Sequence, residues 1–188
     1  DYVWVIDPLD GTTNFIHGVP HFAISIALKI KGQLEVAVVL DPIRKEEFTA
    51  ARGRGAQLNG RRIRVTGRTR LEGALLATGF PFRPDQNRIF DSYINMFADF
   101  AKATAGIRRA GAASLDLAYV AAGRYDGFWE FGLSEWDIAG GALLVAEAGG
   151  LIGDIKGGMD HMKSGDVVCA PPKLFKAMLQ TINPHLPR

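Results

Sequence analysis

The sequence of 188 residues has little cysteine, little net charge and no long apolar run. Its one cysteine, Cys169, excludes an internal disulfide and so the disulfide-rich secreted scaffolds. The 22 basic and 20 acidic side chains leave a net charge of +2, which gives no whole-molecule field for nucleic acid or an anionic membrane. No stretch approaches the ~20 apolar residues of a membrane helix, and no signal-peptide pattern opens the chain. These absences predict a cytoplasmic protein with no membrane partner.

The composition is that of an ordinary globular domain. Hydrophobic residues make up 47% of the chain and charged residues 22%, which is enough apolar material for a sizeable core. We therefore expect one domain over residues 1–188. The first residues enter a strand-like apolar run, 1–6, with no initiator Met or helix before it. We expect that an amino-terminal portion of the fold is absent from this chain.

The first half of the sequence is rich in strand-forming residues. Three such runs cover residues 22–30, 33–40 and 47–51. The Asn59-Gly60 pair favours a tight hairpin turn, and alternation over 63–65 follows it. These patterns predict an antiparallel meander that forms one sheet.

The second half alternates between helix and strand patterns. Within 85–106, Asp85 can cap a helix, Gly106 can end it, and large apolar residues recur every three or four positions, at Ile89, Tyr93, Phe97 and Phe100. We expect this stripe to be core or subunit contact. Further helices are predicted over 114–123, 137–149 and 172–179, and further strands over 125–131 and 167–170. The order predicts an α/β (α+β) layered sandwich.

The turn-rich segment after the first strand is the strongest candidate for chemistry. Pro8 holds Asp7 extended, and a turn would bring Asp10 round three residues later, so that two carboxylates converge. Mg²⁺ prefers oxygen ligands, and clustered carboxylates are costly unless a cation neutralises them. Gly11 permits a tight turn, and Thr12 can begin a helix whose N–H groups suit a phosphate. The alternative is a plain surface turn.

A second carboxylate lies far along the chain. Asp137 is predicted to open a helix, and small residues follow it at Ala139, Gly140 and Gly141. An acid at a helix start is favoured by the helix dipole, so a simple capping role is the alternative to metal binding.

Two strings carry a resemblance to a known family. Residues 4–15, Trp-Val-Ile-Asp-Pro-Leu-Asp-Gly-Thr-Thr-Asn-Phe, and residues 136–141, Trp-Asp-Ile-Ala-Gly-Gly, resemble the two signatures of the inositol monophosphatase family, with the bacterial inositol-1-monophosphatases the most similar branch. The resemblance covers essentially the whole chain. It implies an αβαβα layered fold and a homodimer.

The resemblance also implies a set of site residues. Mg²⁺ would be held by Asp7, Asp10, Asp137 and the Leu9 carbonyl. Leu9 would also contact the substrate, and Gly11 and Thr12 would bind its phosphate. Asp10 and Asp137 would also contact substrate hydroxyls, Glu130 would contact inositol, and the substrate loop would include Arg108, Gly111, Ala112 and Ala113.

The implied reaction is Mg²⁺-dependent hydrolysis of inositol 1-phosphate and similar polyol phosphates, with inhibition by lithium. Thr12 would position the attacking water, Asp10 would share the catalytic role, and no phosphoenzyme is needed. The family pattern includes an upstream Gly-Glu motif whose glutamate binds metal. That motif is not within these 188 residues, which leaves open whether the chain is active by itself.

Other functions are kept as alternatives. Fructose-1,6-bisphosphatases and nucleotide-bisphosphate phosphatases are similar enzymes with the same metal carboxylates. Bacterial members of the family are also associated with RNA polymerase and ribosomal RNA transcription complexes, which implies a possible RNA or polymerase partner. A local basic cluster is compatible with that role, although a solvated hairpin face is the simpler interpretation: Arg52, Arg54, Arg61, Arg62 and Arg64.

Two weaker patterns are interpreted as structural. His17 and His21 have a zinc-like spacing, but Gly18 and Pro20 between them argue against the helix that would join them. Gly53-Arg54-Gly55 lacks the third glycine of a nucleotide fingerprint and is predicted to be a turn.

Overall fold

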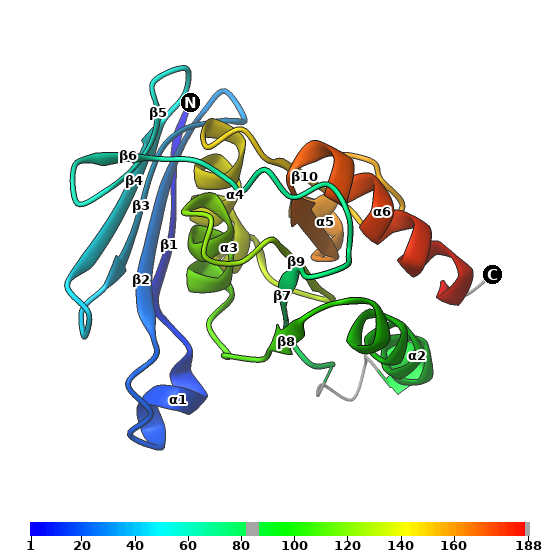
Figure 1. Cartoon of the computed structure of the whole chain (residues 1–188). Helices are drawn as coiled ribbons and strands as arrows, with labels where there is room; N and C mark the ends of the chain where they lie inside the picture. The colour runs from blue at the N-terminus through cyan, green and yellow to red at the C-terminus, as the bar shows by residue number, and fades with distance from the viewer. Residues whose placement is uncertain (82–86, 187–188) are drawn as a thin grey trace.

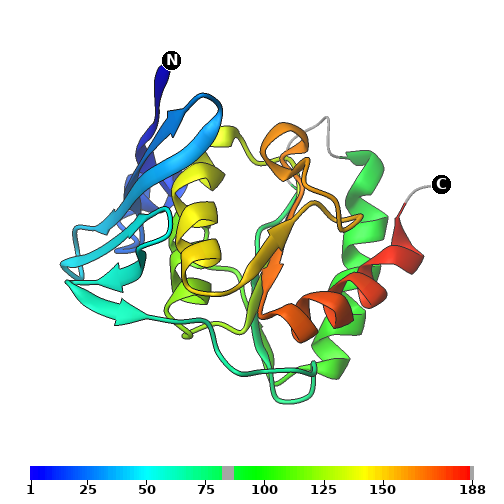
Figure 2. The same ribbon diagram turned by 90° about the horizontal axis from the view of Figure 1, so that it is seen from above.

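The protein is described here by a computed structural model that covers residues 1–81 and 87–186. Two sheets and two layers of helices alternate through the molecule, and this order is visible in two perpendicular views (Figures 1 and 2). The predicted α/β layered sandwich is therefore confirmed. Of the helices described, none combines the length and apolar character needed to cross a membrane.

The first sheet is an antiparallel meander of six strands, as predicted. In sheet order they are β1 (Tyr2–Asp10), β2 (Ala23–Ile30), β3 (Gln33–Asp41), β4 (Glu46–Ala51), β5 (Gly55–Leu58) and β6 (Arg61–Ile63). The short helix α1 (Thr12–Ile16) lies between β1 and β2. Asn59 and Gly60 both have positive φ, 48° and 75°, which the tight β5–β6 hairpin requires.

Side chains on the two faces of this sheet differ sharply in burial. Val5, Ala27 and Val39 point inward and are buried, in the alternation expected of strands with one covered face. On the other face Tyr2 and Trp4 are exposed by 74% and 61%. Within the described ranges, the layers are sheet, helices, sheet, helices, which correspond to the last four layers of the αβαβα order.

The inner helical layer consists of α3 (Ala113–Ala121) and α4 (Glu135–Glu147), which are buried between the two sheets. Glycines allow this close packing. A Cβ at Gly140 would lie 2.6 Å from Ser25 Oγ of the first sheet, and one at Gly141 would lie 2.4 Å from Leu117 Cβ of α3. Side chains at these two positions would push α4 away from both neighbours.

The second sheet has the strand order β10-β11-β9-β7-β8. Its strands are β7 (Leu75–Thr78), β8 (Gly106–Arg108), β9 (Gly127–Glu130), β10 (Leu151–Gly153) and β11 (Val167–Ala170), and β7 runs parallel to both β8 and β9. The outer helices are α2 (Asn87–Ala103) and α6 (Pro172–Ile182). The short helices α5 (His161–Ser164) and η2 (Asn183–His185) complete the chain.

The apolar stripe of α2 packs into the second core, as predicted. Tyr93 and Phe100 are fully buried, and the Phe100 ring lies 4.5 Å, centroid to centroid, from the ring of Trp129 on β9. Ile89 and Phe97 are packed against the same cluster. Whether the stripe also makes a subunit contact stays a prediction.

Several predicted boundaries were wrong. Helix α2 ends at Ala103, not at Gly106, because Ala105 already pairs with Ala74 and Gly106 begins β8; the predicted cap Asp85 lies outside the described residues. Helix α4 begins at Glu135, so Asp137 is its third residue and not its first. Strand β9 is shorter than predicted, and helix α6 is longer, continuing to Ile182. Strands β7, β8 and β10 were not predicted.

Candidate metal centre and active site

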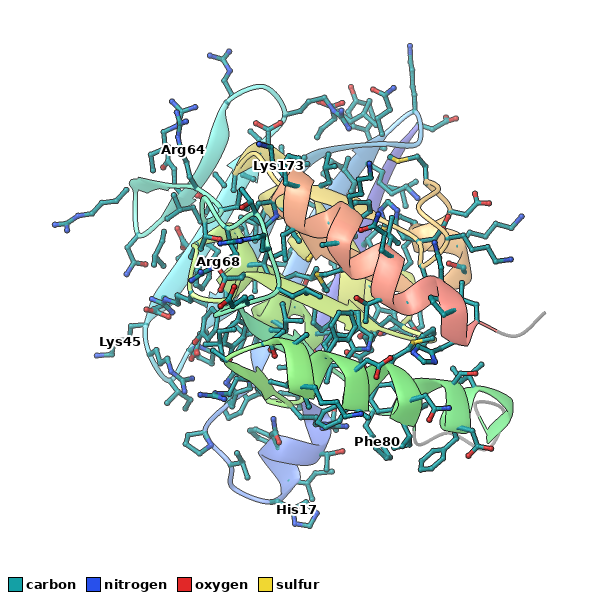
Figure 3. All side chains as sticks on the ribbon, turned by 45° about the vertical axis from the view of Figure 1, so that its right-hand side comes forward. His17, Lys45, Arg64, Arg68, Phe80 and Lys173 are labelled. Carbon is teal, nitrogen blue, oxygen red and sulfur yellow. The ribbon has the colours of Figure 1, made fainter. Side chains whose placement is uncertain are left out.

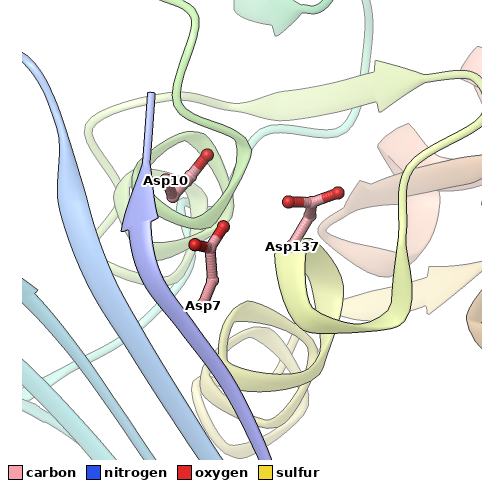
Figure 4. Close-up of side chains that lie close together, drawn as sticks. All are labelled: Asp7, Asp10 and Asp137. Carbon is pink, nitrogen blue, oxygen red and sulfur yellow. The ribbon is translucent and has the colours of Figure 1, made fainter. Parts of the chain in front are cut away.

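Three carboxylates from distant parts of the chain meet at one point. Asp7 and Asp10 come from β1, Asp137 comes from the first turn of α4, and one oxygen of each lies within 4.8 Å of the others (Figure 4). The first sheet and α4 hold them together through the buried contacts of Val5, Ala27 and Ala139. Among the residues described, this is the acidic cluster that can hold a metal ion.

A β-bulge explains how Asp7 and Asp10 face the same way. Residues three apart on a regular strand point to opposite faces. Here Asp7 pairs with Ser25 but Asp10 pairs with Ala23, so three steps along β1 oppose two steps along β2. The predicted turn between the two carboxylates was wrong, since β1 continues through Asp10.

Asp10 is the most constrained member of the cluster. Ser114, at the start of α3, donates to its Oδ2 from both the backbone N–H, at 2.8 Å, and the hydroxyl, at 2.5 Å. Burial raises the pKa of Asp10 to about 7; the two hydrogen bonds from Ser114 oppose the rise, and the nearby charges of Asp137 and Asp7 add to it. The hydrogen bonds around the cluster thus do not fully compensate its negative charge. A bound divalent cation would neutralise the remaining charge.

The other two carboxylates are held by backbone groups. The N–H of Leu9 donates to Asp7 Oδ1 at 2.9 Å, and the N–H of Ser134 donates to Asp137 Oδ2 at 2.7 Å. The Leu9 carbonyl accepts a hydrogen bond of 2.9 Å from the Thr12 hydroxyl. The four oxygens that the family resemblance assigns to metal therefore come from elements with fixed backbones.

Gly11 and Asn14 join the carboxylate motif to the predicted substrate loop around Gly111. Gly11 has φ of 84°, and a Cβ there would lie 3.0 Å from the His21 carbonyl oxygen and 3.3 Å from the Gly111 carbonyl oxygen. The Asn14 amide donates to the carbonyls of His21 at 2.8 Å and Ala110 at 2.9 Å. Asn14 belongs to the quoted motif, but no role was predicted for it.

A cleft of about 490 Å³ opens beside the cluster. Of the predicted site residues, those that line it are Asp10, Gly11, Thr12, Gly111, Ala113, Glu130 and Asp137. Arg108 and Ala112 do not line it: the Arg108 guanidinium bonds the Ile107 carbonyl, and Ala112 is buried below. The guanidinium in the cleft wall belongs to Arg109, and Gly79 and Phe80 also contribute without having been predicted.

A further carboxyl, Asp116, lies beneath the cleft and was not predicted. It is fully buried on α3, and neither of its oxygens has a hydrogen-bond partner among the described residues. Burial raises its pKa well above the ordinary value, and the charges of Glu130 and Asp10 raise it further. Burial among these acids thus favours the protonated form of Asp116, behind the charged surface of the site.

The two patterns interpreted as structural have no place in this site. His17 is exposed and His21 is buried, and neither belongs to the metal-binding cluster found among the described residues. Gly53 and Gly55 form the β4–β5 turn, where their N–H groups donate to the Glu147 carboxylate. The predicted turn is confirmed.

The fold and the cleft with its three carboxylates define a layered α/β protein with a candidate metal centre. The chain belongs to the inositol monophosphatase family, whose family model matches residues 1–186. It is 71% identical over 187 residues to the Nus factor SuhB of Pseudomonas aeruginosa, a match that covers 100% of this chain and 69% of that protein.

Solved structures agree in fold. The extragenic suppressor protein SuhB of Bartonella henselae is 45% identical with a TM-score of 0.92, over 96% of this chain and 69% of that one. The inositol monophosphatase of Anabaena (Nostoc) sp. PCC 7120 is 38% identical with a TM-score of 0.92, over 97% of this chain and 75% of that one.

Proposed function

We propose that this chain carries the active site of a Mg²⁺-dependent phosphomonoesterase that releases phosphate from inositol 1-phosphate and similar polyol phosphates. The observation that carries the proposal is the convergence of Asp7, Asp10 and Asp137 within 4.8 Å beside a cleft that also contains Glu130. The likeness to a solved inositol monophosphatase supports the choice of substrate.

The residues of the chain divide the work of hydrolysis. Bound at the three carboxylates, Mg²⁺ would supply Lewis-acid stabilisation of the phosphate oxygens and activation of water. Gly11 and Thr12 present the N–H groups at the start of α1 to the phosphate, and the Thr12 hydroxyl orients the attacking water. Glu130 accepts hydrogen bonds from the polyol hydroxyls on the opposite wall, and Arg109 adds positive charge there.

A direct assay tests this proposal. Phosphate release from inositol 1-phosphate is measured with Mg²⁺ and with EDTA, for the 188-residue chain and for a form extended at its amino end to the length of its relatives. We expect Mg²⁺-dependent release by the extended form. Faster release from fructose 1,6-bisphosphate or a nucleotide bisphosphate would instead favour those related enzymes, and no release from any ester would sink the catalytic proposal.

Three finer expectations belong to the same proposal. Lithium is expected to inhibit the enzyme, the protein is expected to form a homodimer, and it is expected to act in the cytoplasm. Inhibition curves with LiCl and light scattering check the first two directly.

A close contact in the cleft leads to a specificity prediction. A Cβ at Gly79 would lie 1.8 Å from the Glu130 carboxylate, so Gly79→Ala must displace that side chain. We expect KM for inositol 1-phosphate to rise about tenfold, with the Mg²⁺ dependence unchanged, because one polar contact is worth about 1.4 kcal/mol. The matched control is Gly67→Ala, where a Cβ meets no atom of the described residues within 4 Å. An unchanged KM for Gly79→Ala would remove Glu130 from substrate binding.

A second candidate function is a role in transcription complexes. The relative at 71% identity is named a Nus factor, and this name favours a partner such as RNA polymerase or the RNA of a ribosomal RNA transcription complex. Binding that survives Asp10→Asn would separate this role from catalysis. Binding that disappears with Asp10→Asn would tie it to the metal centre.

A further inference from the structure

Positive charge is concentrated in one stretch of the chain. Residues 48–71 contain none of the 20 acidic side chains and seven of the 22 basic ones, so the rest of the chain carries a net negative charge. All seven are arginines and all are exposed: Arg52, Arg54, Arg61, Arg62, Arg64, Arg68 and Arg70. The small net charge of the whole protein therefore hides a strongly basic segment.

This segment lies at the end of the molecule opposite the cleft. The connection after β6 crosses the carboxyl ends of the inner helices, where Val65 N–H donates to the Ala148 carbonyl and the Arg64 carbonyl approaches Gly123. The cleft is at the amino ends of the same helices, which for the 13 residues of α4 means a separation of about 20 Å. Figure 3 shows Arg64 at one end and His17 and Phe80 at the other.

Most of these charges have no acidic partner in the part of the chain that the structure describes. Arg52 pairs with Glu35 at 3.1 Å, and Arg68 lies 3.7 Å from Asp126. Within residues 1–81 and 87–186 no ion pair joins an acid to Arg54, Arg62, Arg64 or Arg70, and Glu147 is occupied by the N–H groups of the β4–β5 turn. We call Arg54, Arg62, Arg64, Arg68 and Arg70 the arginine surface.

Local structure does not account for so many charges. The negative ends of α3 and α4 favour cations nearby, but this effect is satisfied by one or two side chains and is worth about 0.3–1 kcal/mol each. Beside the helix ends, Arg68 and Arg70 also line an open polar hollow of about 390 Å³ with Thr66, Gly67, Thr69, Glu72 and Asp126. An open hollow with guanidinium groups in its wall has room for a ligand group.

The chemistry of the surface selects the kind of ligand. Arginine binds phosphate with two parallel N–H groups, and the segment has no lysine at all. Residues 49–71 contain no aromatic side chain on which a base could stack, and no large apolar side chain is exposed there that could enter a membrane. These features fit a ligand that is a hydrated polymer with a phosphate backbone, in which the arginines contact the phosphates and not the bases.

We infer that the arginine surface binds the phosphate backbone of nucleic acid, independently of the catalytic cleft. This inference rests on the second candidate function, the role in transcription complexes, and locates it on the molecule. Such binding is insensitive to base sequence and weakens steeply as salt is raised.

The test measures binding of short fluorescein-labelled single-stranded RNA, and DNA of the same sequence, over a range of salt concentrations. The double variant Arg64→Glu/Arg70→Glu changes two arginines that pair with no acid among the described residues. The control Lys163→Glu/Lys176→Glu, on α5 and α6, makes the same change of net charge elsewhere. We expect the arginine variant to lose at least about tenfold in affinity, with the slope of log K against log salt smaller by about 1.4, and the lysine variant to bind nearly as wild type does.

The outcomes separate this inference from the proposed catalysis. Similar binding of RNA and DNA, kept in Asp10→Asn, supports a backbone site apart from the metal centre, and the arginine variant should keep its phosphate release. Equal losses in both charge variants, competition by polyglutamate as strong as by RNA, or a strong preference for one base sequence would each overturn it. Failure of phosphate release in every form would refute the enzyme proposal and leave this one standing.

Discussion

Replacing Asp10 by Asn is expected to lower Mg²⁺-dependent phosphate release about 10³-fold, which corresponds to about 4 kcal/mol of lost transition-state stabilisation. Asparagine keeps the size of the side chain and can still accept from Ser114, which already holds Oδ2. What is lost is one of three negative charges gathered within 4.8 Å. Both cation affinity and the stabilisation of the reacting phosphate depend on that charge.

The measurement is kcat/KM for inositol 1-phosphate over a series of Mg²⁺ concentrations. Asp91→Asn, an exposed aspartate on α2, is the control for loss of a carboxylate elsewhere and should be as active as wild type. Circular dichroism shows whether Asp10→Asn is folded. A folded variant that keeps more than about a tenth of the activity would exclude Asp10 from the metal site.

In EDTA, the free energy of unfolding is expected to decrease as pH rises from about 4 to about 7, so that the protein becomes less stable, with Asp10 as a main cause. The pKa of this group is about 7 in the folded chain and 3.8 in the reference state, so the folded state binds the additional proton between these pH values. Stability is then present below the lower pKa and is lost as pH rises through the higher one. A shift of three units is worth at most about 4 kcal/mol.

Urea denaturation of the wild type and of Asp10→Asn, at pH 5 and pH 8 in EDTA, isolates this contribution. Between pH 5 and pH 8, the stability of Asp10→Asn relative to the wild type should rise by up to about 2.7 kcal/mol, because asparagine has no proton to lose and about two of the three pH units between the two pKa values lie above pH 5. Saturating Mg²⁺ should restore the wild type at pH 8. Two denaturation series that stay parallel between the two pH values would show that Asp10 is ionised in the metal-free fold.

The sequence was most informative where function and local pattern coincide. The two motifs around Asp10 and Asp137 predicted which carboxylates the structure brings together. The bulge in β1 was not predicted, because a bulge depends on the pairing of β1 with β2, although a proline inside a strand is a hint of one.

Gly79 and Arg109, which follow strands β7 and β8 of the second sheet and line the cleft, were not predicted from the sequence, whereas Glu130 on β9 was. Strand β7 is a run of four residues between two parallel partners, too short and too uniform for a period to be seen. Gly79 follows it, and its contact with Glu130 joins positions far apart in the chain. Arg109 and Arg108 are adjacent in sequence, and only the path of the chain after β8 decides which one lines the cleft.

The position of β1 at the edge of its sheet has a consequence for metal affinity. An edge strand is bonded on one side, here to β2, and can detach locally at less cost than the whole molecule unfolds. Detachment would carry Asp7 and Asp10 away from Asp137, so the cation site is complete only while β1 remains paired with β2. A cation at a hundred times its Kd would then raise the cost of opening β1 by about 2.7 kcal/mol. The ion would act as a latch on the strand that supplies two of its own ligands.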